Sequence, residues 1–321
     1  MIAAGAMALA MAIDGVLGWP AGLYVRIGHP VTWIGRAIGA CDRHLNRDAD
    51  SPRTRRLAGV ATLVAVTALA ALPAYGATLI LPAGLSGLIL TALLAWPLLA
   101  TRSLFDHVQA VAQPLAAGDL AGARHAVSMI VGRDPAQLDP AGVARAALES
   151  LAENTSDGIV APLFWGVLLG LPGIAAYKAV NTLDSMIGHR TPRFTDFGWA
   201  SARFDDLVNL VPARLTGALF AVVSGQGRRS VACMRADAAR HRSPNAGWPE
   251  AAMAGALGIR LSGPRIYADR VAQEPWVNGG APDPTPADLT RGLALYRRSM
   301  LALGAGLGGA AGLVWILGGA A

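Results

Sequence analysis

Carboxylate and amide side chains are concentrated at residues 149–158, ESLAENTSDG, immediately before an apolar segment. Arg145, Glu149 and Glu153 recur every four residues, which places them on one face of a helix, and Asp157 follows one turn later. Taken alone, this pattern is typical of a solvated, salt-bridged helix face. Its position favours another interpretation, because carboxylates at the edge of an apolar segment are costly unless they bind something. Paired acids of this kind suit Mg²⁺ that carries a bound phosphate.

A second polar stretch, YKAVNTLDS at residues 177–185, contains the single lysine of the chain. Lys178, Asn181 and Asp184 lie three residues apart and therefore project to nearly one side of a helix. A lysine at the end of an apolar segment is often an interfacial residue whose ammonium reaches for water. The alternative is chemical, because a fixed ammonium can bind phosphate or stabilise the charge of an acyl intermediate.

The third stretch, RFDDLVNLVPAR at residues 203–214, leads into another apolar run. Arg203, Asp206 and Asn209 share one helix face. An adjacent pair of aspartates, here Asp205 and Asp206, can serve only to complement the dipole at the N-terminus of a helix. A metal or nucleotide contact becomes the better interpretation if the three stretches converge in space.

Two turn-like segments add further candidates. The first follows an apolar N-terminal segment that contains Asp14, and it includes His29. A lone histidine is more often structural, but near neutral pH it can act as an acid or a base. The second, SPNAGWP at residues 243–249, combines Asn245 with Trp248. Turn formation alone explains this segment, and a binding loop for a flat ligand is the alternative.

The composition indicates which kind of scaffold positions these residues. The chain has 321 residues, of which 53% are hydrophobic and only 15% are charged. Soluble globular domains carry about a quarter charged residues, so one ordinary water-soluble domain is excluded, and so much apolar surface excludes disorder. The formal net charge is +6, but no basic run is interleaved with aromatic residues. We therefore expect no nucleic-acid partner.

The apolar residues form long blocks. Residues 57–96 contain no Asp, Glu, Lys or Arg, and at about 1.5 Å per residue they suffice for two membrane crossings. A tight turn between them is predicted from four residues: Pro73, Tyr75, Gly76 and Pro82. Full spans are predicted near 1–18, 57–74, 80–100 and 299–320. Two further apolar segments, 159–176 and 207–224, are interrupted by proline, glycine or arginine, as expected of helices buried in protein or beside a wet cavity.

The predicted fold is all-α, a polytopic integral membrane protein with broken or re-entrant helices and cytoplasmic amphipathic helices, forming a single membrane-embedded domain over residues 1–321. The polar regions near 19–56, 102–158 and 225–298 are expected to be cytoplasmic. The first carries seven arginines, whereas the turn near Tyr75 carries none. If residues 159–176 crossed the membrane, the second and third stretches would lie opposite the first. We therefore expect both interrupted segments to enter and return, with their polar ends on the cytoplasmic side.

The common catalytic signatures are absent from the sequence. It contains no G-x-x-x-x-G-K-[ST], G-x-S-x-G, H-E-x-x-H or C-x-x-C pattern. Any nucleotide must therefore be held without a P-loop.

The polar stretches belong to longer blocks that resemble a known family. The blocks are HPV at 29–31, SLAENTSDGIVAP at 150–162, YKAVNTLDSM at 177–186, FGWASARFDDLVN at 197–209, PARL at 212–215 and SPNAGWPEAAMAGALG at 243–258. In this order they resemble adenosylcobinamide-phosphate synthase, the CobD/CbiB family of cobalamin biosynthesis. Two places depart from the pattern: His189 and Pro192 stand in a stretch usually richer in Tyr and Asn, and Ser262 stands where Gly is usual.

The resemblance implies a multi-pass enzyme of the inner membrane whose active site faces the cytoplasm. Such an enzyme joins the free propionate of adenosylcobyric acid to the amine of (R)-1-amino-2-propanol phosphate, or of ethanolamine phosphate, with ATP and Mg²⁺. The polar stretches fit this reaction, because it needs acids for Mg²⁺ and cations for phosphate. Besides the corrinoid, the amino-alcohol phosphate and the lipid bilayer, the expected partners are a second copy of the chain or other enzymes of cobalamin assembly.

The resemblance and the three stretches together give the predicted site. Catalytic roles are predicted for Glu153, Asn154, Lys178 and Asp184, and Mg²⁺ ligation for Glu153, Asp157 and Asp206. Substrate or phosphate binding is predicted for eight residues: Asp14, His29, Asn181, Arg203, Asn209, Arg214, Asn245 and Trp248. Arg235 and Arg242 are further candidates for phosphate binding.

Two other functional classes share some of these features. A membrane transporter also uses broken helices and charges at the membrane boundary, but it usually shows paired repeats, and this sequence has none. A phosphotransferase of the CDP-alcohol type also has Asp-Gly beside a span. Here Asp157-Gly158 is not followed by the Ala-Arg and the two further spaced acids which that chemistry uses.

Overall fold

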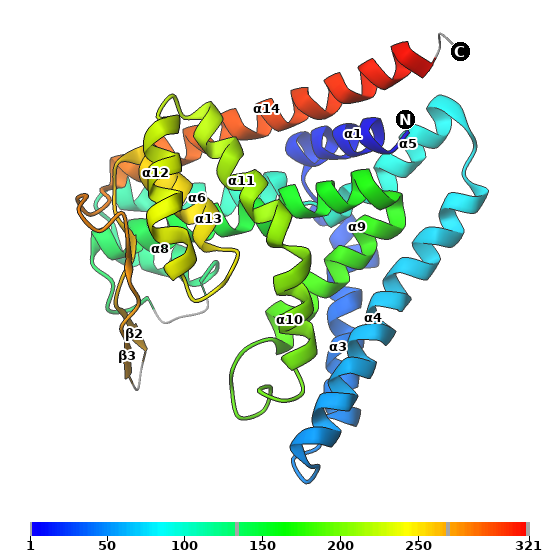
Figure 1. Ribbon diagram of the computed structural model, residues 1–321, viewed down its shortest axis with the longest axis horizontal. Coiled ribbons are helices and arrows are strands. Elements are labelled where there is room, and N and C mark those ends of the chain that lie inside the picture. Colours follow the sequence, from blue (N-terminus) through cyan, green and yellow to red (C-terminus); the bar gives the residue numbers. More distant parts are fainter. Residues whose placement is uncertain (1, 132–134, 268–269, 319–321) are drawn as a thin grey trace. The chain divides into compact units, whose positions relative to one another are not determined.

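The structure is a computed structural model that describes residues 2–131, 135–267 and 270–318 (Figure 1). Helices make up most of the described chain, as predicted. Its strands form two short antiparallel pairs: β1 (Leu261–Ser262) with β4 (Trp276–Val277), and β2 (Arg265–Tyr267) with β3 (Arg270–Ala272). The all-α class is therefore confirmed.

The chain divides into two compact units, each assembled from separate stretches of sequence. Unit 1 comprises Met1–Ala100, Ala161–Asn209 and Gly304–Ala321, and unit 2 comprises Thr101–Val160 and Leu210–Leu303. The three polar stretches are thereby divided, because the first lies in unit 2, the second in unit 1, and the third runs from one unit into the other. The single-domain organisation remains a prediction.

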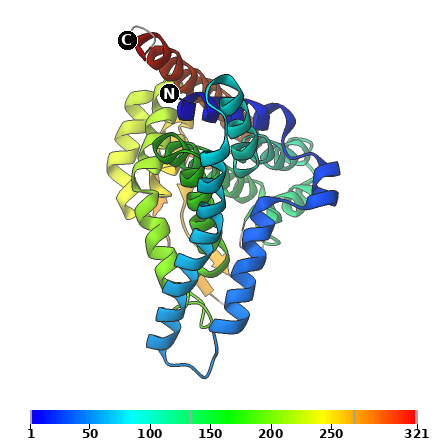
Figure 2. The same ribbon diagram turned by 90° about the vertical axis from the view of Figure 1, so that its right-hand side faces the viewer.

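Unit 1 packs its helices around a small apolar core. Its helices are α1 (Ile2–Leu17), α2 (Ala21–Ile27), α3 (Pro30–Leu45), α4 (Pro52–Ile80), α5 (Gly84–Ala95), the 3-10 helix η1 (Trp96–Leu98), α9 (Ala161–Ile187) and α10 (Trp199–Val208). Helices α3 and α4 form an antiparallel hairpin (Figure 2). Pro52 and the Ser51 hydroxyl, which accepts the Thr54 N–H at 3.2 Å, start α4. The core joins α3, α4 and α9 through Ile38, Val66, Ala179, Leu183, Ile187 and Phe197.

Unit 2 is a helical assembly with many small residues at its contacts. Its elements besides the strands are α6 (Thr101–Ala116), α7 (Leu120–Ser128), α8 (Pro140–Thr155), the π-helical turn η2 (Ser156–Val160), α11 (Leu210–Val223), α12 (Gly227–Asp237), the 3-10 helix η3 (Ala238–Arg240), α13 (Gly247–Leu257) and the first part of α14 (Pro286–Gly318). A Cβ added at Gly255 would lie 2.7 Å from the Arg229 carbonyl oxygen, so α12 and α13 touch through their backbones.

Three described helical stretches are long and apolar enough to cross a membrane: Pro52–Ile80, Gly84–Ala116 and Pro140–Ile187. Two further helix pairs pass the same test only when each bent pair is counted together. In α4 only 17% of the apolar window is buried, and Leu72 and Leu79 on its outer side are about two-thirds exposed, at 66% and 68%. A long, uncharged and outward-facing apolar helix is what a lipid bilayer requires. The protein is therefore a membrane protein.

The structure corrects the predicted turn after the first long span. Helix α4 continues through Pro73, Tyr75 and Gly76 to Ile80, and the turn lies at Leu81–Ala83, where only Pro82 of the four predicted residues takes part. A proline inside a membrane helix removes one N–H donor and leaves the helix intact where its surroundings re-satisfy the backbone. The span predicted near 57–74 is thus longer, and the next helix begins at Gly84.

The predicted first span near 1–18 is also corrected. Helix α1 has 16 residues, which is about 24 Å and too short to cross a bilayer core. The segment passes the span test only together with the following helices, from which it is bent by 106°. The apolar C-terminal segment near 299–320 is helical to Gly318, and residues 319 and 320 lie outside the described part of the chain.

The interruption predicted within 159–176 is confirmed. Helix α9 is broken at Gly170, whose φ of 68° and ψ of −155° are not helical, and Pro172 follows two residues later. Glycine adopts such a backbone conformation without a steric penalty, and proline then starts the next helical turn. The break separates an apolar first half of α9 from the second half, which carries the polar residues.

Candidate functional site

The second half of α9 presents the predicted row of polar residues. Tyr177 is buried, and Lys178, Asn181 and Asp184 are each half-buried on successive helical turns. The Lys178 ammonium lies close enough to the His29 ring for their charges to interact. Two residues predicted separately to bind phosphate are therefore neighbours in unit 1.

Helix α10 adds two carboxylates that interact with Asp184. Asp205 is buried, with 8% exposure, whereas Asp206 is half-buried. The charges that act on Asp205 come from Asp184 and Asp206, and the Asn181 side chain faces the same carboxylate. Asp206 also interacts with Arg203, at 3.9 Å, and with Arg190. Acidic residues from two helices thus gather at one place in unit 1.

A chain of hydrogen bonds fixes the Asp205 carboxylate. The Tyr177 hydroxyl donates to Asn209 Oδ1 at 2.9 Å, and Asn209 Nδ2 donates to Asp205 Oδ2 at 3.0 Å. The same amide nitrogen lies 3.1 Å from the Asp205 carbonyl oxygen, so Asn209 also closes the last turn of α10. Asn209, predicted to bind substrate, is buried and orients an acid instead of standing in solvent.

The loop between α9 and α10 is bound to the arginine-rich end of the α3–α4 hairpin. Arg193 binds Asp42 at 2.9 Å, Arg56 binds Asp196 at 2.8 Å, and Asn46 Nδ2 donates to the Arg193 carbonyl oxygen at 3.1 Å. The α9–α10 loop and the arginine-rich loop therefore lie at the same end of unit 1 (Figure 1).

His29 and Asp14 have structural surroundings in unit 1. His29 caps α3: its Nδ1 accepts the Val31 N–H at 3.2 Å, and Thr32 completes the capping box. Its ring also packs edge-on against Trp19, with ring centroids 5.0 Å apart. Asp14 is buried on α1. The capping interaction explains the position of His29. The charge interaction with Lys178 links His29 to the polar residues Lys178, Asn181 and Asp184 on α9.

In unit 2, the residues of the predicted acidic face of α8 differ in burial. Glu149 is buried, and its Oε1 accepts the Ser262 N–H at 2.7 Å. Glu153 and Asn154 are exposed, and Asp157 is half-buried on the π-helical turn η2. The Asn154 amide donates to the Ser150 carbonyl oxygen at 2.9 Å. Single π-helical turns are frequent at functional sites, and this one displays Asp157 beside Glu153.

Arg145, which shares that face in the sequence, has partners elsewhere in unit 2. Arg145 and Arg260 both stack on Trp276, 4.7 and 4.1 Å from its ring centroid, and both bind Asp283. The hydrogen bond from Arg260 holds the pKa of the Asp283 carboxyl below its usual range. This arrangement fixes the segment around β4.

The turn at residues 243–249 is held from inside unit 2. The backbone N–H groups of Asn245 and Ala246 both donate to the Ser243 hydroxyl at 3.2 Å, and Asn245 is buried. Trp248, half-buried, lies under the Arg214 guanidinium at 4.4 Å from its ring centroid. Arg214 and Trp248, both predicted to bind substrate, therefore form one cation–π pair.

A buried pair of titratable side chains stands behind this turn. His241 Nε2 lies 3.6 Å from Glu250 Oε1, and the two side chains are only 4% and 2% exposed. His241 Nδ1 accepts the Ser243 N–H at 3.1 Å, so the second ring nitrogen faces the carboxylate. Glu250 lies within the block at 243–258, and His241 precedes it, so neither residue is part of the predicted site.

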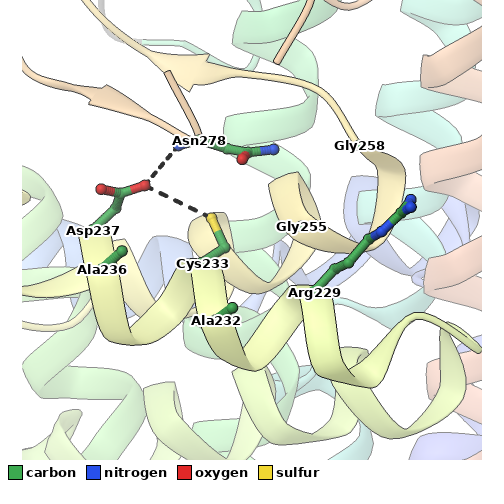
Figure 3. Close-up of a pocket in the computed structure, with 8 residues that line it drawn as sticks. All are labelled: Arg229, Ala232, Cys233, Ala236, Asp237, Gly255, Gly258 and Asn278. Atoms are coloured by element: carbon green, nitrogen blue, oxygen red, sulfur yellow. Dashed lines mark hydrogen bonds between the residues drawn. The ribbon is translucent and has the colours of Figure 1, made fainter. Parts of the chain in front are cut away.

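Unit 2 also contains a cavity of about 460 Å³ between α12, the end of α13 and Asn278 (Figure 3). Asp237 accepts the Asn278 N–H at 2.8 Å and contacts the Cys233 sulfur at 3.9 Å. Burial, followed by the nearby Asp237 charge, raises the pKa of the Cys233 thiol to about 12, so it stays protonated and unreactive at neutral pH. None of the predicted site residues lines this cavity.

The predicted residues are therefore divided between the two units. Unit 1 holds Asp14, His29, Lys178, Asn181, Asp184, Arg203, Asp206 and Asn209, and unit 2 holds Glu153, Asn154, Asp157, Arg214, Asn245 and Trp248. Arg235 and Arg242 are exposed in unit 2. The predicted site includes neither His241 nor Glu250, and Asp205 enters it only through the Asp205–Asp206 pair, as a possible metal or nucleotide contact.

The described part of the chain contains no cluster of three His, Cys, Asp or Glu side chains that could enclose a metal ion. Mg²⁺ does not need such a cluster, because it usually binds one or two carboxylates together with water and phosphate oxygens. The donor sets in the two units, which contain carboxylates and amides but no thiolate, suit this hard cation.

Comparison with known proteins identifies the family. The family model described as CobD/Cbib protein matches residues 7–296. A protein of Rhodobacter capsulatus named "Cobalamin biosynthesis protein CobD" is 65% identical over 314 residues, which is 98% of each chain. Relatives with the same name from Sinorhizobium sp. and Brucella suis are 48% and 46% identical and cover 90% and 92% of this chain and 92% of their own. No solved structure matches the chain. The chain belongs to the CobD/CbiB family of cobalamin biosynthesis proteins.

Proposed function

We propose that the protein is a membrane-bound, ATP-dependent amide ligase. It joins adenosylcobyric acid to (R)-1-amino-2-propanol phosphate, or to ethanolamine phosphate, and forms adenosylcobinamide phosphate. Membership of a family of cobalamin biosynthesis proteins and helices suited to a bilayer support this proposal. The observation that carries it is the polar row on α9, where Lys178 is near enough to His29 for their charges to interact and Asp184 interacts with Asp206 of α10.

The chemistry explains why such a row is needed. A carboxylate reacts with an amine only after one of its oxygens becomes a leaving group. Transfer of the γ-phosphoryl group of ATP to the propionate oxygen gives an acyl phosphate and ADP. The amine nitrogen then attacks the acyl carbon and loses a proton, and inorganic phosphate leaves. Lys178 supplies a positive charge for the transferred phosphoryl group, as the single lysine of the chain at the polar end of a broken apolar helix.

Magnesium fits the acidic residues that were predicted to hold it. Glu153 and Asp157 are four residues apart on a helical path, one exposed and one half-buried, so two carboxylates are accessible on one face. Asp206, the other residue predicted to bind Mg²⁺, lies in unit 1, where it interacts with Asp205. When bound, Mg²⁺ neutralises phosphate charge during phosphoryl transfer. The two carboxylates would hold it through their oxygen atoms, and the neighbouring Asn154 side chain donates to the Ser150 carbonyl oxygen.

A cytoplasmic site is supported by the loop between α9 and α10. That loop is bound to the arginine-rich end of the α3–α4 hairpin, which the positive-inside rule assigns to the cytoplasm. Lys178, Asn181 and Asp184 approach this end along α9. ATP is cytoplasmic, so the proposed reaction requires this orientation.

Turnover of the purified protein tests the proposed function. The protein in detergent or nanodiscs is given adenosylcobyric acid, ATP, Mg²⁺ and either amino-alcohol phosphate, and the products are separated by mass spectrometry. We expect adenosylcobinamide phosphate and one ADP per amide formed, with the preferred amine giving the larger kcat/KM. No amide product with either amine would exclude the proposed reaction.

Asp157→Asn tests the acid group of unit 2. Loss of one carboxylate should lower turnover by about a hundredfold or more, because a group that stabilises developing charge is removed. A Mg²⁺ titration distinguishes a weakened cation site from a general loss of activity, and the thermal unfolding midpoint checks the fold. Near-normal turnover across the titration would remove Asp157 from the site.

A further inference from the structure

One face of α12 lines the cavity of unit 2 (Figure 3). Arg229 and Asp237 lie at its two ends, and Ala232, Cys233 and Ala236 lie between them. Each of these residues is three or four positions from another, which places all of them along one side of the helix. Arg229 and Asp237 are eight residues apart, or about 12 Å along the helix axis. A positive and a negative side chain are therefore separated by small side chains.

The facing wall of the cavity contains two glycines at the end of α13. A Cβ at Gly255 would lie 2.7 Å from the Arg229 carbonyl oxygen, so the two helices can approach this closely only with glycine at that position. Gly258 ends α13 with a φ of 70°, and a Cβ there would have nothing within 4 Å. The space beside Gly258 is therefore open.

The Asp237 carboxylate is fixed at its end of the cavity. Its Oδ2 accepts the Asn278 N–H at 2.8 Å. Asn278 has a φ of 55°, and its Nδ2 donates to the Ile259 carbonyl oxygen at 2.9 Å. A residue other than glycine keeps such a conformation only where its surroundings enforce it, and such residues cluster at functional sites. The second oxygen, Asp237 Oδ1, lies 3.4 Å from the exposed Arg240, and a carboxylate oxygen can accept a further hydrogen bond.

Arg229 supplies the positive charge at the other end. It is exposed, and no carboxylate in the described part of the chain forms a salt bridge with it. It is the third residue of α12, whose N-cap Gln226 makes no side-chain capping hydrogen bond. The first turn of a helix carries a partial positive charge on its backbone N–H groups. Arg229 and this turn together favour an anion of phosphate type.

We propose that this cavity binds a small zwitterion, with a phosphate group at Arg229 and a protonated amine at Asp237. Its volume of about 460 Å³ is in the range of small-molecule sites. The choice of ligand rests on the proposed function, in which the amino-alcohol phosphate carries these two groups. Its binding needs neither ATP nor the corrinoid, because unit 2 supplies both charged side chains.

The two ends of the cavity explain why one charge on a ligand does not suffice. A phosphate ester without an amine binds Arg229 but offers no cation to the Asp237 carboxylate. An amine without a phosphate leaves the Arg229 charge unmatched. Only a molecule with both groups is complementary to both ends, so the cavity discriminates against fragments of the zwitterion.

Binding of the amino-alcohol phosphates alone tests the proposal. Full-length protein in nanodiscs of neutral phosphatidylcholine is titrated with ethanolamine phosphate and with (R)-1-amino-2-propanol phosphate, and the heat of binding is measured. ATP, Mg²⁺ and corrinoid are left out. We expect saturable binding of at least one of the two compounds. Ethanolamine and ethyl phosphate, which each lack one charged group, should bind at least about tenfold more weakly.

Three variants assign the binding to this cavity. Arg229→Gln removes the positive charge and should weaken binding about 10–100-fold. Arg228→Gln makes the same change at a neighbouring exposed position that does not line the cavity, and it should leave the affinity unchanged. Ala236→Leu enlarges a side chain of the cavity wall without any change of charge, and it should also weaken binding. Leucine is a good helix former, so α12 should remain folded.

Several results would overturn the proposal. They are wild-type affinity in folded Arg229→Gln protein, equal affinity for ethyl phosphate and the amino-alcohol phosphates, and no saturable binding of either amino-alcohol phosphate. Amide formation with an unchanged KM for the amine in Arg229→Gln and Ala236→Leu would also overturn it and leave the proposed function intact. The expected binding in a protein that forms no amide would support the cavity and exclude the ligase.

Discussion

At the scale of single residues, Lys178 is the side chain on which the proposed chemistry depends most. Lys178→Met removes the charge and keeps the length of the side chain, so we expect kcat/KM for ligation to fall about a hundredfold or more. Lys178→Arg keeps the charge but changes its shape, and it should retain more activity than Lys178→Met. Steady-state kinetics of the natural protein, Lys178→Met and Lys178→Arg test this prediction. Their unfolding midpoints show whether the variants are folded. Unchanged kcat and KM in Lys178→Met would end the assignment.

Ser262 shows how a departure from the family pattern can be explained by backbone geometry. Its φ is 59°, in the left-handed region that favours glycine, and its buried hydroxyl has no hydrogen-bond partner. Its N–H donates to Glu149 Oε1, and a glycine at this position would keep that hydrogen bond. Ser262→Gly should therefore raise the free energy of unfolding by about 1–2 kcal/mol.

The control for this prediction is Ser262→Ala, which removes the hydroxyl and keeps the strained φ. Thermal unfolding in detergent should rank the glycine variant above the alanine variant, and both above or near the natural protein. A glycine variant less stable than the natural protein would show that the serine hydroxyl has a stabilising contact.

The helical spacing predicted the site residues that lie along one helix. Lys178, Asn181 and Asp184 share a face because residues three apart on a helix always do. Spacing could not predict that Glu149 binds a backbone N–H of Ser262, or that Arg145 stacks on Trp276. These partners are more than a hundred residues away, and only tertiary packing brings them close. The burial of Asp205 could not be predicted for the same reason, since it depends on α9.

At the scale of elements, α4 needs glycine at one position and not at another. A Cβ at Gly59 would lie 1.9 Å from the Phe197 carbonyl oxygen, whereas Gly76 has nothing within 4 Å. Gly59→Ala should cost about 1–3 kcal/mol, because α4 must move away from the loop that Arg56 binds. Gly76→Ala, the matched control, should be neutral or stabilising by up to about 1 kcal/mol.

Unfolding midpoints and size-exclusion profiles of the two α4 variants provide the measurement. Equal stability of Gly59→Ala and Gly76→Ala would mean that α4 does not pack against the residues before α10 as closely as described.

The elements themselves were largely predictable, and their boundaries were less so. Uncharged runs predicted the apolar helices, and the Gly170–Pro172 break followed from local residue types. Pro73 was misleading, because the rule that proline ends a helix holds in water, where the unfolded backbone is solvated. In a membrane the backbone must stay hydrogen-bonded, so the helix continues past proline to Ile80.

At the scale of the whole molecule, the length of α4 and the contacts of the α9–α10 loop predict how unit 1 is oriented in the membrane. Helix α4 has 29 residues, which is about 43 Å and exceeds a bilayer core. We therefore expect its arginine-rich start and the turn at Leu81–Ala83 to lie on opposite sides of the membrane. The α9–α10 loop is bound to the arginine-rich start. We expect that loop to be cytoplasmic.

Single cysteines test this orientation in a background that lacks Cys41 and Cys233. Ser185, Thr195 and Ser86 are exposed positions. An impermeant maleimide applied to intact cells should label Ser86→Cys and leave Ser185→Cys and Thr195→Cys unlabelled until the membrane is permeabilised. Labelling of Ser185→Cys and Thr195→Cys in intact cells would place the α9 row outside the cytoplasm and contradict a site that uses ATP.

The central claim is that the enzyme activates a corrinoid carboxylate by phosphorylation, and the fate of the carboxylate oxygen tests it most directly. Adenosylcobyric acid carrying ¹⁸O in its free propionate is converted with ATP, Mg²⁺ and the preferred amino-alcohol phosphate. Mass spectrometry then follows the label in the phosphate products. If the propionate is phosphorylated, we expect one ¹⁸O in each inorganic phosphate released per amide formed. Label in AMP, or amide formation with unlabelled phosphate, would contradict it.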